Sequence, residues 1–391
     1  MGRTFAIALS VLVAAALVPL ATGSTSDKQA FRGTVYLGMD TPLTGPQAIV
    51  GQGDRETMRA LVAYWNSRGG ISGRRLVVDV LDNGSNPSQA VQNVQRFVGD
   101  SKYVGILGSG NAAAAVATAP LATNGRIPFI ALSPPTTIVS PPRPYVYVAL
   151  PTSRLYAYNM ARYLRRLGVR RIALMGDNGG FGRDGVGQVE SLARRYGLTV
   201  TQRVIFSPTT TSFTAELSRI RNSDAQALWL WTVTPAATTI VKEFRQLRMS
   251  QRLVLTGGNL SPQFLQGTCP DVNGALVNGY LGNVWRYLPK KHPSRTPAQL
   301  VERLVKHRIS VFNVDASTAL YGFKAAMVRG GFSRAAVNTA LETKLRGLPT
   351  PGGRLYFSST NHSGIQLTSM WAGRITSCQP RPLFGAAFRR R

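Results

Sequence analysis

Residues 34–81 read TVYLGMDTPLTGPQAIVGQGDRETMRALVAYWNSRGGISGRRLVVDVL, and this stretch decides the fold class. It opens and closes on short apolar runs of strand length, rich in β-branched residues. Between the runs, apolar side chains recur with the spacing of one helix face: Met58, Leu61, Val62 and Trp65. This spacing predicts a helix over 54–67, which Gly69 and Gly70 end. A strand, a crossover helix and a second strand form the unit from which parallel sheets are built.

The alternation continues along the chain in two sets. The first set has expected strands at 34–39, 76–81, 104–107 and 128–131, and helices at 54–67, 87–98 and 112–122. After a proline-rich segment, the second set has helices at 152–167, 185–196, 213–221 and 235–247, and strands at 171–175, 199–205, 227–231 and 253–256. The remainder has expected helices at 297–307, 316–328 and 334–345, and strand-like runs at 354–357 and 366–371. We therefore expect an α/β protein with two lobes, each a parallel sheet covered by helices.

The N-terminus predicts export. Arg3 precedes an apolar run at 5–21, and the small residues at 21–23 suit cleavage by a signal peptidase. We expect a signal peptide at 1–23 and a flexible leader at 24–32. No cysteine lies near the cleavage point, so we expect a protein of the periplasm or cell surface without a lipid anchor. The apolar run is also close to the shortest membrane span, which leaves an uncleaved anchor as the alternative.

The two cysteines, Cys269 and Cys378, are 109 residues apart. An even number of cysteines in an exported chain indicates a disulfide. Two unpaired thiols are the alternative.

The chain is strongly basic: it has 38 arginines and eight lysines against 17 acidic residues, which gives a formal net charge of +29. Such a charge raises the question of nucleic-acid binding. The arginines are spread along the whole chain, however, and no zinc-finger spacing or aromatic RNA-binding motif accompanies them. We therefore expect no nucleic-acid partner, and attraction of anionic ligands or of an anionic membrane surface remains open.

The motifs of several enzyme classes are absent from the sequence. There is no phosphate-binding P-loop and no G-x-S-x-G nucleophile motif, and the glycines of 105–110 have the wrong spacing for a dinucleotide turn. His292, His307 and His362 stand in polar surroundings without metal-ligand spacing, so we expect them on the surface. The sequence thus predicts a binding protein rather than an enzyme, with no cofactor and no metal.

Small polar residues follow two expected strands of the first lobe. Ser109, Gly110 and Asn111 precede an alanine-rich helix, and a Ser-Pro-Pro-Thr-Thr run at 133–137 follows the next strand. Open α/β sheets bind ligands at the carboxyl ends of their strands, and a helix N-terminus supplies free N–H groups that suit an anion. The alternative is that these residues are only helix caps and turn residues.

Four stretches in order resemble the opening of periplasmic leucine-binding-protein-like domains: Thr41-Pro-Leu-Thr-Gly-Pro46, Trp65-Asn66-Ser67-Arg68-Gly69-Gly70-Ile71-Ser72-Gly73, Asp82, and Asn86-Pro87-Ser88-Gln89-Ala90. The resemblance continues through 119–122, 127–130 and 176–182 and weakens after about residue 260. It implies two Rossmann-like lobes joined by three crossings, closure by a hinge, and docking on a membrane permease of an ABC importer. The implied lobes are 33–150 plus 285–346 for lobe 1, and 151–284 plus 347–391 for lobe 2.

The resemblance also implies ligand contacts. We predict the following binding residues: Ser109, Gly110, Asn111, Pro135, Thr136, Thr137, Phe181, Thr234 and Asn259. The sequence departs from the family pattern at three places. Val50 stands where an aromatic is common, and so does Val233 or Thr234 after the strand that ends at Trp231. No acid lies near 257–259 to pair with a ligand ammonium.

An unpaired ammonium would be costly to bury, so we expect a ligand other than a simple α-amino acid. A carboxylate, an amide or a small aromatic acid fits better, within the wider class of small polar ligands. Asp177 and Asp315 are the acids that would replace the missing one. We expect a monomer that delivers its ligand to an ABC importer; a module that senses the ligand and signals to a membrane partner is the alternative.

Overall fold

The computed structural model describes residues 1–2 and 31–388. The expected signal peptide and nearly all of the expected leader lie outside the described residues, as does the tail at 389–391. Within 31–388, no helix is long and apolar enough to cross a membrane.

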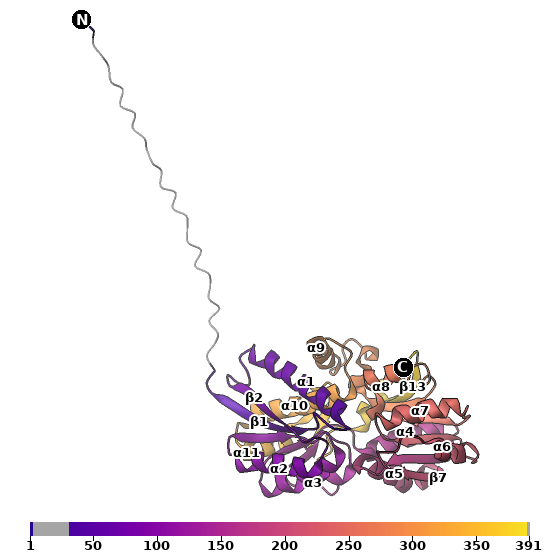
Figure 1. The fold of residues 1–391 in the computed structure, drawn as a ribbon. Coiled ribbons are helices and arrows are strands. Elements are labelled where there is room, and N and C mark those ends of the chain that lie inside the picture. Colours follow the sequence, from indigo (N-terminus) through magenta and orange to yellow (C-terminus); the bar gives the residue numbers. More distant parts are fainter. Residues whose placement is uncertain (3–30, 389–391) are drawn as a thin grey trace. The chain divides into compact units, whose positions relative to one another are not determined.

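Lobe 1 is built on a five-stranded sheet in the order β2-β1-β3-β4-β5, with all neighbours parallel. Its strands are β1 (Thr34–Thr41), β2 (Arg75–Asp82), β3 (Tyr103–Leu107), β4 (Phe129–Ala131) and β5 (Val146–Val148). Its helices are α1 (Ala48–Asn66), α2 (Pro87–Gly99), α3 (Ala112–Asn124), α10 (Val311–Gly330) and α11 (Arg334–Lys344). Helix α1 packs on α10 and α2 packs on α3, and Figure 1 shows the two pairs on opposite sides of β1.

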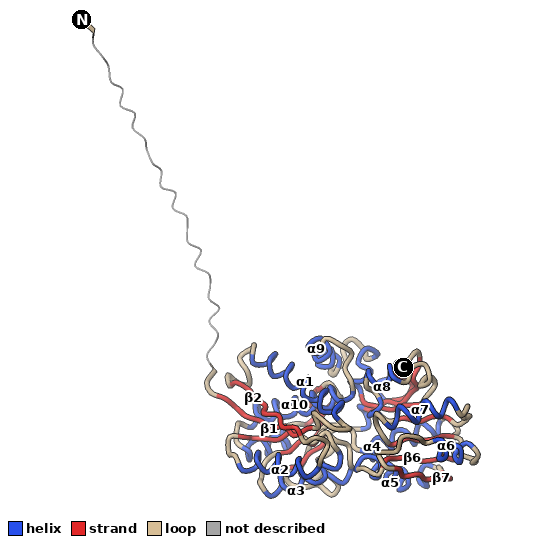
Figure 2. Tube along the Cα trace, in the orientation of Figure 1, coloured by secondary structure: helices blue, strands red, loops and turns tan. Residues whose placement is uncertain are grey.

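Lobe 2 is built on a seven-stranded sheet in the order β14-β13-β10-β9-β8-β6-β7. Five strands are parallel: β6 (Arg171–Asp177), β7 (Thr199–Phe206), β8 (Ala227–Trp231), β9 (Arg252–Leu255) and β10 (Leu276–Tyr280). Two are antiparallel: β13 (Met370–Thr376) and β14 (Gln379–Gly385). The helices that belong to this sheet are α4 (Ser153–Arg166), α5 (Gly180–Ala193), α6 (Thr214–Arg221), α7 (Ala236–Gln246) and α8 (Pro262–Gly267). Loops follow the carboxyl ends of the parallel strands in both lobes (tan in Figure 2).

The chain passes between the two sheets three times. The first crossing links β5 to α4, and the second leaves β10 through a 3-10 segment at Leu281–Tyr287. The second crossing leads into α9 (Arg295–Val305), which packs on α1, and then into α10 and α11. The third crossing carries the hairpin β11 (Arg346–Thr350) and β12 (Gly353–Tyr356) and returns to β13. The expected fold class of two α/β lobes is therefore confirmed, while the residue boundaries of the lobes stay a prediction.

Several expected elements differ in their ends. Helix α1 begins at Ala48 rather than 54, because Gly51, Gln52 and Gly53 interrupt the apolar pattern between Val50 and Met58. Helix α5 begins at Gly180 rather than 185, because Gly180 and Gly182 in its first turn carry no apolar periodicity. The strand-like run at 366–371 is wrong in extent, since 367–369 form a 3-10 turn before β13. Strands β10 and β14 were not expected, and Pro380 and Pro382 fit in β14 because it is an edge strand.

The expectation that every histidine lies on the surface is wrong for His362. Its side chain is only 3% exposed, its Nδ1 lies 2.8 Å from the carbonyl oxygen of Val146, and its ring packs on Tyr147. Residues 361–365 run beside β5, where Val148 and Ser363 form a bridge. His362 therefore holds the third crossing against the edge strand of the lobe 1 sheet. Its polar neighbours in sequence gave no indication that it is buried.

The expected disulfide is confirmed. Cys269 and Cys378 are joined, with 5.7 Å between their Cα atoms. The bond ties the segment after α8 to the turn between β13 and β14, and the two cysteines are 109 residues apart in sequence.

We predict that the double variant Cys269→Ser/Cys378→Ser loses stability. A crosslink that closes a loop of this length lowers the entropy of the unfolded chain and contributes about 4.7 kcal/mol in the chain-entropy model. The free energy of unfolding, measured in urea without reductant, should fall by about 2–5 kcal/mol. A reductant should destabilise the wild type and leave the double variant unchanged; equal stability of the two proteins would contradict the prediction.

Candidate ligand-binding site

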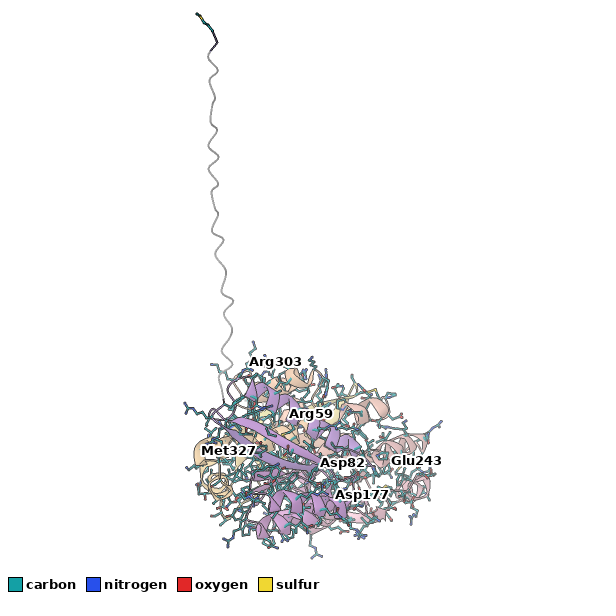
Figure 3. The ribbon with its side chains drawn as sticks, turned by 60° about the vertical axis from the view of Figure 1, so that its left-hand side comes forward. Arg59, Asp82, Asp177, Glu243, Arg303 and Met327 are labelled. Atoms are coloured by element: carbon teal, nitrogen blue, oxygen red, sulfur yellow. A yellow bond between two sulfur atoms is a disulfide. The ribbon has the colours of Figure 1, made fainter. Side chains whose placement is uncertain are left out.

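A cavity of about 300 Å³ lies between the two lobes. Lobe 1 contributes Gly110–Ala113 and Leu132–Pro134, lobe 2 contributes Gly179–Phe181, and the start of α10 contributes Val311, Phe312 and Asp315. These residues follow the carboxyl ends of β3, β4 and β6 or belong to the second crossing. Asp177, which ends β6, is labelled in Figure 3 and also lines the cavity. The location agrees with the rule that parallel sheets bind ligands beyond the carboxyl ends of their strands.

The N-terminus of α3 forms one side of the cavity. The side chain of Asn111 caps the helix by accepting a hydrogen bond from the N–H of Ala114, with 3.0 Å between the atoms. The N–H groups of Ala112 and Ala113 precede the first intrahelical hydrogen bond and point out of the helix end. Gly110 is required here because a Cβ atom would lie 2.8 Å from Val50 and 2.9 Å from the Asp54 carboxyl.

The N-terminus of α5 lies against that of α3 at the cavity wall. A Cβ atom on Gly180 would lie only 3.1 Å from the Cβ of Ala112, so the two backbones approach as closely as glycine permits. Each helix presents the positive end of its dipole to the same space. Two adjacent helix N-termini favour an anionic group, such as a carboxylate, beside them in the cavity.

Asp177 occupies part of the α5 N-terminus. Its Oδ1 accepts a hydrogen bond of 2.9 Å from the N–H of Gly179. Burial raises the pKa of the Asp177 carboxyl above its usual range, against hydrogen bonds from Thr232 and from the Gly179 and Gly182 backbone that lower it. Because its oxygens already serve the helix end, Asp177 is poorly placed to pair with a ligand cation.

Asp315 is a buried carboxyl group in the same cavity, where it favours a positive charge rather than an anion. It is 7% exposed, and the Tyr280 hydroxyl donates a hydrogen bond to its Oδ1. Burial raises the pKa of Asp315 to about 7, and the hydrogen bond from Tyr280 opposes this rise. Among the described residues no lysine, arginine or histidine forms an ion pair with Asp315.

Asp54 lies behind Gly110, on the side of α1 that faces the core. It is 1% exposed; Thr41 donates a hydrogen bond of 2.9 Å to its Oδ2, and its Oδ1 has no hydrogen-bond partner. Burial raises the pKa of Asp54 well above the usual range, and the nearby Asp315 raises it further. Two buried carboxyl groups therefore neighbour the cavity without a cation among the described residues.

The remaining wall is mostly apolar. It contains Val50, Leu132, Leu150, Phe181, Val233, Val311 and Phe312, with Tyr156 near Asp315. Phe181 packs on Trp231, with 5.4 Å between the ring centroids. The cavity thus combines helix N-termini that favour an anion, a buried carboxyl group and an apolar wall, and this combination selects ligands by size and charge.

A hydrogen bond between Thr136 and Asp184 links the two lobes. The backbone N–H of Thr136, after β4 in lobe 1, donates to Oδ2 of Asp184 on α5 in lobe 2, with 2.8 Å between the atoms. The Oγ1 of Thr136 accepts from the N–H of Arg154, at the start of α4. These contacts hold the carboxyl end of β4 against lobe 2.

Three of the nine residues predicted from sequence line the cavity: Gly110, Asn111 and Phe181. Ser109 is buried beneath it, where its hydroxyl accepts a hydrogen bond from Asn83. Asn259 is also buried, and its amide serves the Thr256 cap and the Thr232 carbonyl. The other four line other surfaces or lie outside the wall: Pro135, Thr136, Thr137 and Thr234. A role in binding stays a prediction for all nine.

The sequence prediction overlooked Asp54 and Tyr156. A signal for Asp54 was present, because it lies four residues before Met58 and hence on the same helix face as the apolar stripe. An acid on a buried face calls for a partner or a function. The local sequence does not indicate that Tyr156 lines a cavity, because it fits the apolar face of its helix.

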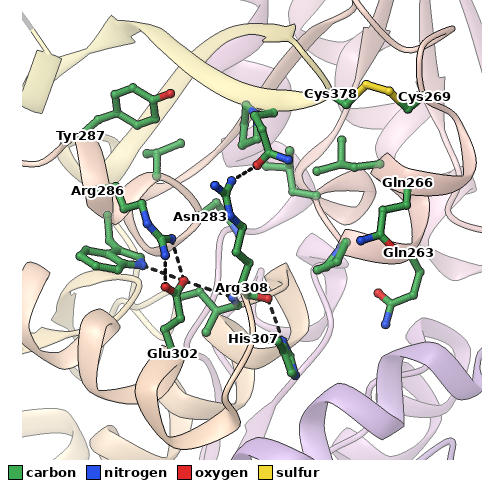
Figure 4. A pocket seen from close by; sticks show the side chains of 18 residues that line it. Gln263, Gln266, Cys269, Asn283, Arg286, Tyr287, Glu302, His307, Arg308 and Cys378 are labelled. Atoms are coloured by element: carbon green, nitrogen blue, oxygen red, sulfur yellow. Dashed lines mark hydrogen bonds and ion pairs between the residues drawn. A yellow bond between two sulfur atoms is a disulfide. The ribbon is translucent and has the colours of Figure 1, made fainter.

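A second cavity, of about 630 Å³, lies beside the disulfide (Figure 4). Its charged groups bind one another: Glu302 accepts hydrogen bonds from Arg286 and from the Trp285 indole, and Arg308 bonds Gln379. Exposed side chains such as Gln263 and Tyr287 form its rim. We regard the cavity between the lobes as the candidate site because its polar groups remain available. The part of the chain that the structure describes has no group of side chains suited to hold a metal ion.

The chain is similar to known proteins over most of its length. The family described as periplasmic binding protein matches residues 34–379. The chain belongs to this family. Membership indicates an extracytoplasmic binding protein and agrees with the leucine-binding type expected from the sequence.

Three similar proteins illustrate the relationship. The Leu/Ile/Val-binding protein BraC3 of Rhizobium johnstonii is 23% identical over 356 residues, which cover 88% of this chain and 94% of that protein. The structure of an extracellular ligand-binding receptor from Rhodopseudomonas palustris HaA2 has a TM-score of 0.83 at 20% identity and covers 90% of this chain and 99% of its own. An ABC-transporter solute-binding protein from R. palustris in complex with benzoate has a TM-score of 0.79 at 16% identity, covering 91% and 97%.

The raised pKa of Asp315 predicts a pH-dependent stability. Because the folded state holds the proton up to about pH 7 and the ordinary value is 3.8, wild-type stability is lost as the pH rises between these values. The variant Asp315→Asn lacks this titration, so its free energy of unfolding relative to wild type should rise by about 2–3 kcal/mol from pH 5 to pH 8. Urea unfolding at both pH values checks this. A difference that does not depend on pH would show that Asp315 does not titrate in this range.

Proposed function

We propose that the protein captures a small polar ligand in the cavity between its lobes and delivers it unchanged to the membrane permease of an ABC importer. The observation that supports this most is the cavity itself, which the N-termini of α3 and α5 line together with Asp315. Such a site binds and orients a ligand, and we propose no chemical step for it. We further propose that the protein works as a monomer, since closure needs an accessible cleft.

The ligand class is amino acid, amide or small carboxylate. Convergent helix N-termini favour a carboxylate, and the apolar wall favours a short aliphatic or aromatic group. A cavity of about 300 Å³ suits a ligand of that size. One relative is named for leucine, isoleucine and valine, and one similar structure holds benzoate; all four compounds carry a carboxylate.

The cavity can be filled by one substitution. Ala113 is half-buried and lines the cavity at the first turn of α3, so Ala113→Phe should occupy the ligand's space. Val116 lies on the same helix, 41% exposed and away from the cavity, and Val116→Phe is the matched control. A thermal-shift screen would use amino acids, short amides, urea, and aliphatic and aromatic carboxylates.

We predict that compounds which stabilise the wild type also stabilise Val116→Phe and have no effect on Ala113→Phe. A ligand at 100 times its dissociation constant adds about 2.7 kcal/mol of stability, which gives a measurable shift. Retained binding by Ala113→Phe would place the ligand elsewhere and contradict the proposed function.

Closure should depend on Asp184. Removal of its carboxyl takes away the acceptor for the Thr136 N–H and lowers the population of the closed form. We predict that Asp184→Ala weakens ligand binding about tenfold, as expected for the loss of one charge-assisted hydrogen bond. Glu190→Ala, an exposed change on the same helix whose carboxyl pairs with Arg203, is the control. Calorimetric titration of both variants with a compound from the screen decides the point; equal affinities would show that this bond does not support closure.

A further inference from the structure

Asp315 is a carboxyl group in the cavity with only one of its two oxygens hydrogen-bonded among the described residues. Its Oδ1 accepts from Tyr280, and its Oδ2 has no hydrogen-bond partner among the described residues. The side chain is more than nine-tenths buried and still lines the cavity. A carboxylate in such a place is stable only with a cation or a proton beside it.

Among the described residues, the groups that surround Asp315 supply no positive charge. Tyr280 from β10, Tyr156 from α4 and Asp54 from α1 are its titratable neighbours, and Asp177 lines the same cavity. All of them are neutral or acidic. Asp54 itself does not line the cavity, so Asp315 is the buried carboxyl group beside it that a ligand can reach.

Two adjacent buried carboxyl groups cannot both ionise at low cost, so at least one holds a proton in the unliganded protein. Asp54 lies deeper, behind Gly110, and is the one that keeps its proton. Asp315 reaches the cavity, where a ligand cation can replace its proton. The exchange is balanced: the ligand keeps its charge, the carboxyl becomes carboxylate, and the proton passes to the solvent.

We propose that the ligand carries a positively charged nitrogen, that this nitrogen binds Asp315, and that Asp315 releases one proton to solvent as it binds. This inference rests on the proposed function, because it assigns the ligand's charge at the same site. It replaces the sequence-based expectation of a ligand without an ammonium group. The missing acid near 257–259 is supplied from a different element, α10, at the second crossing.

The test uses matched compounds that differ only by the nitrogen. L-leucine is compared with 4-methylpentanoate, and L-phenylalanine with 3-phenylpropanoate, beside the amines 3-methylbutylamine and benzylamine. Binding to the mature protein is measured by thermal shift and calorimetry for wild type, Asp315→Asn, and the exposed control Asp100→Asn. Compounds with the nitrogen should bind wild type and Asp100→Asn, and should bind Asp315→Asn at least about tenfold more weakly.

Proton release gives a readout that a merely structural role for Asp315 would not produce. Titration in two buffers of different ionisation enthalpy should show about one proton released per ligand at pH 6 and almost none at pH 8.5. The affinity for wild type should fall about tenfold for each pH unit below 7, and this dependence should vanish in Asp315→Asn.

The outcomes separate this inference from the proposed function. Tighter binding of the compounds that lack nitrogen, undiminished in Asp315→Asn, overturns the cation and leaves the proposed function standing. Binding of the amines without proton release overturns the exchange. If no compound binds, including the amides and carboxylates of the wider screen, the result contradicts both this inference and the proposed function.

Discussion

The close approach of α3 and α5 is the constraint on which the site depends. Gly180 lies against Ala112 with no room for a larger side chain, and this contact brings two helix N-termini from different sheets to one place. Each helix is aimed by its own sheet, because in a parallel α/β unit the helix begins where the preceding strand ends. The hydrogen bond from Thr136 to Asp184 holds the lobes together a few residues away. The result is a cavity whose wall carries the positive ends of two helix dipoles.

The second crossing completes the cavity from the side. Helix α10 packs along α1 and places Val311, Phe312 and Asp315 at the boundary between the lobes. A buried, unpaired carboxylate such as that of Asp315 lowers the stability of the fold, because its charge loses contact with water. The same unfavourable burial becomes useful when a ligand brings the opposite charge, since the interaction then takes place away from water.

Much of the fold follows from the sequence. The strand–helix–strand periodicity of 34–81 and the motifs near Thr41, Trp65 and Asn86 were sufficient to predict two α/β lobes, and the two cysteines predicted the disulfide. The edges of elements were harder, because the first turn of α5 is glycine and the strand β10 shows no alternation. Predicted site residues such as Ser109 and Asn259 turned out to serve internal hydrogen bonds, which sequence cannot distinguish from ligand contacts. Asp54 and Asp315 are 261 residues apart in sequence, and only the packing of α1 on α10 brings them near each other.

Binding of the ligand in the cavity between the lobes is tested by a crystal structure of residues 24–391 with a compound that stabilises the protein. We expect electron density between the first turns of α3 and α5 and the carboxyl of Asp315, with the Thr136–Asp184 bond formed. Density in the cavity beside the disulfide, with the space between the lobes holding only water, would contradict it.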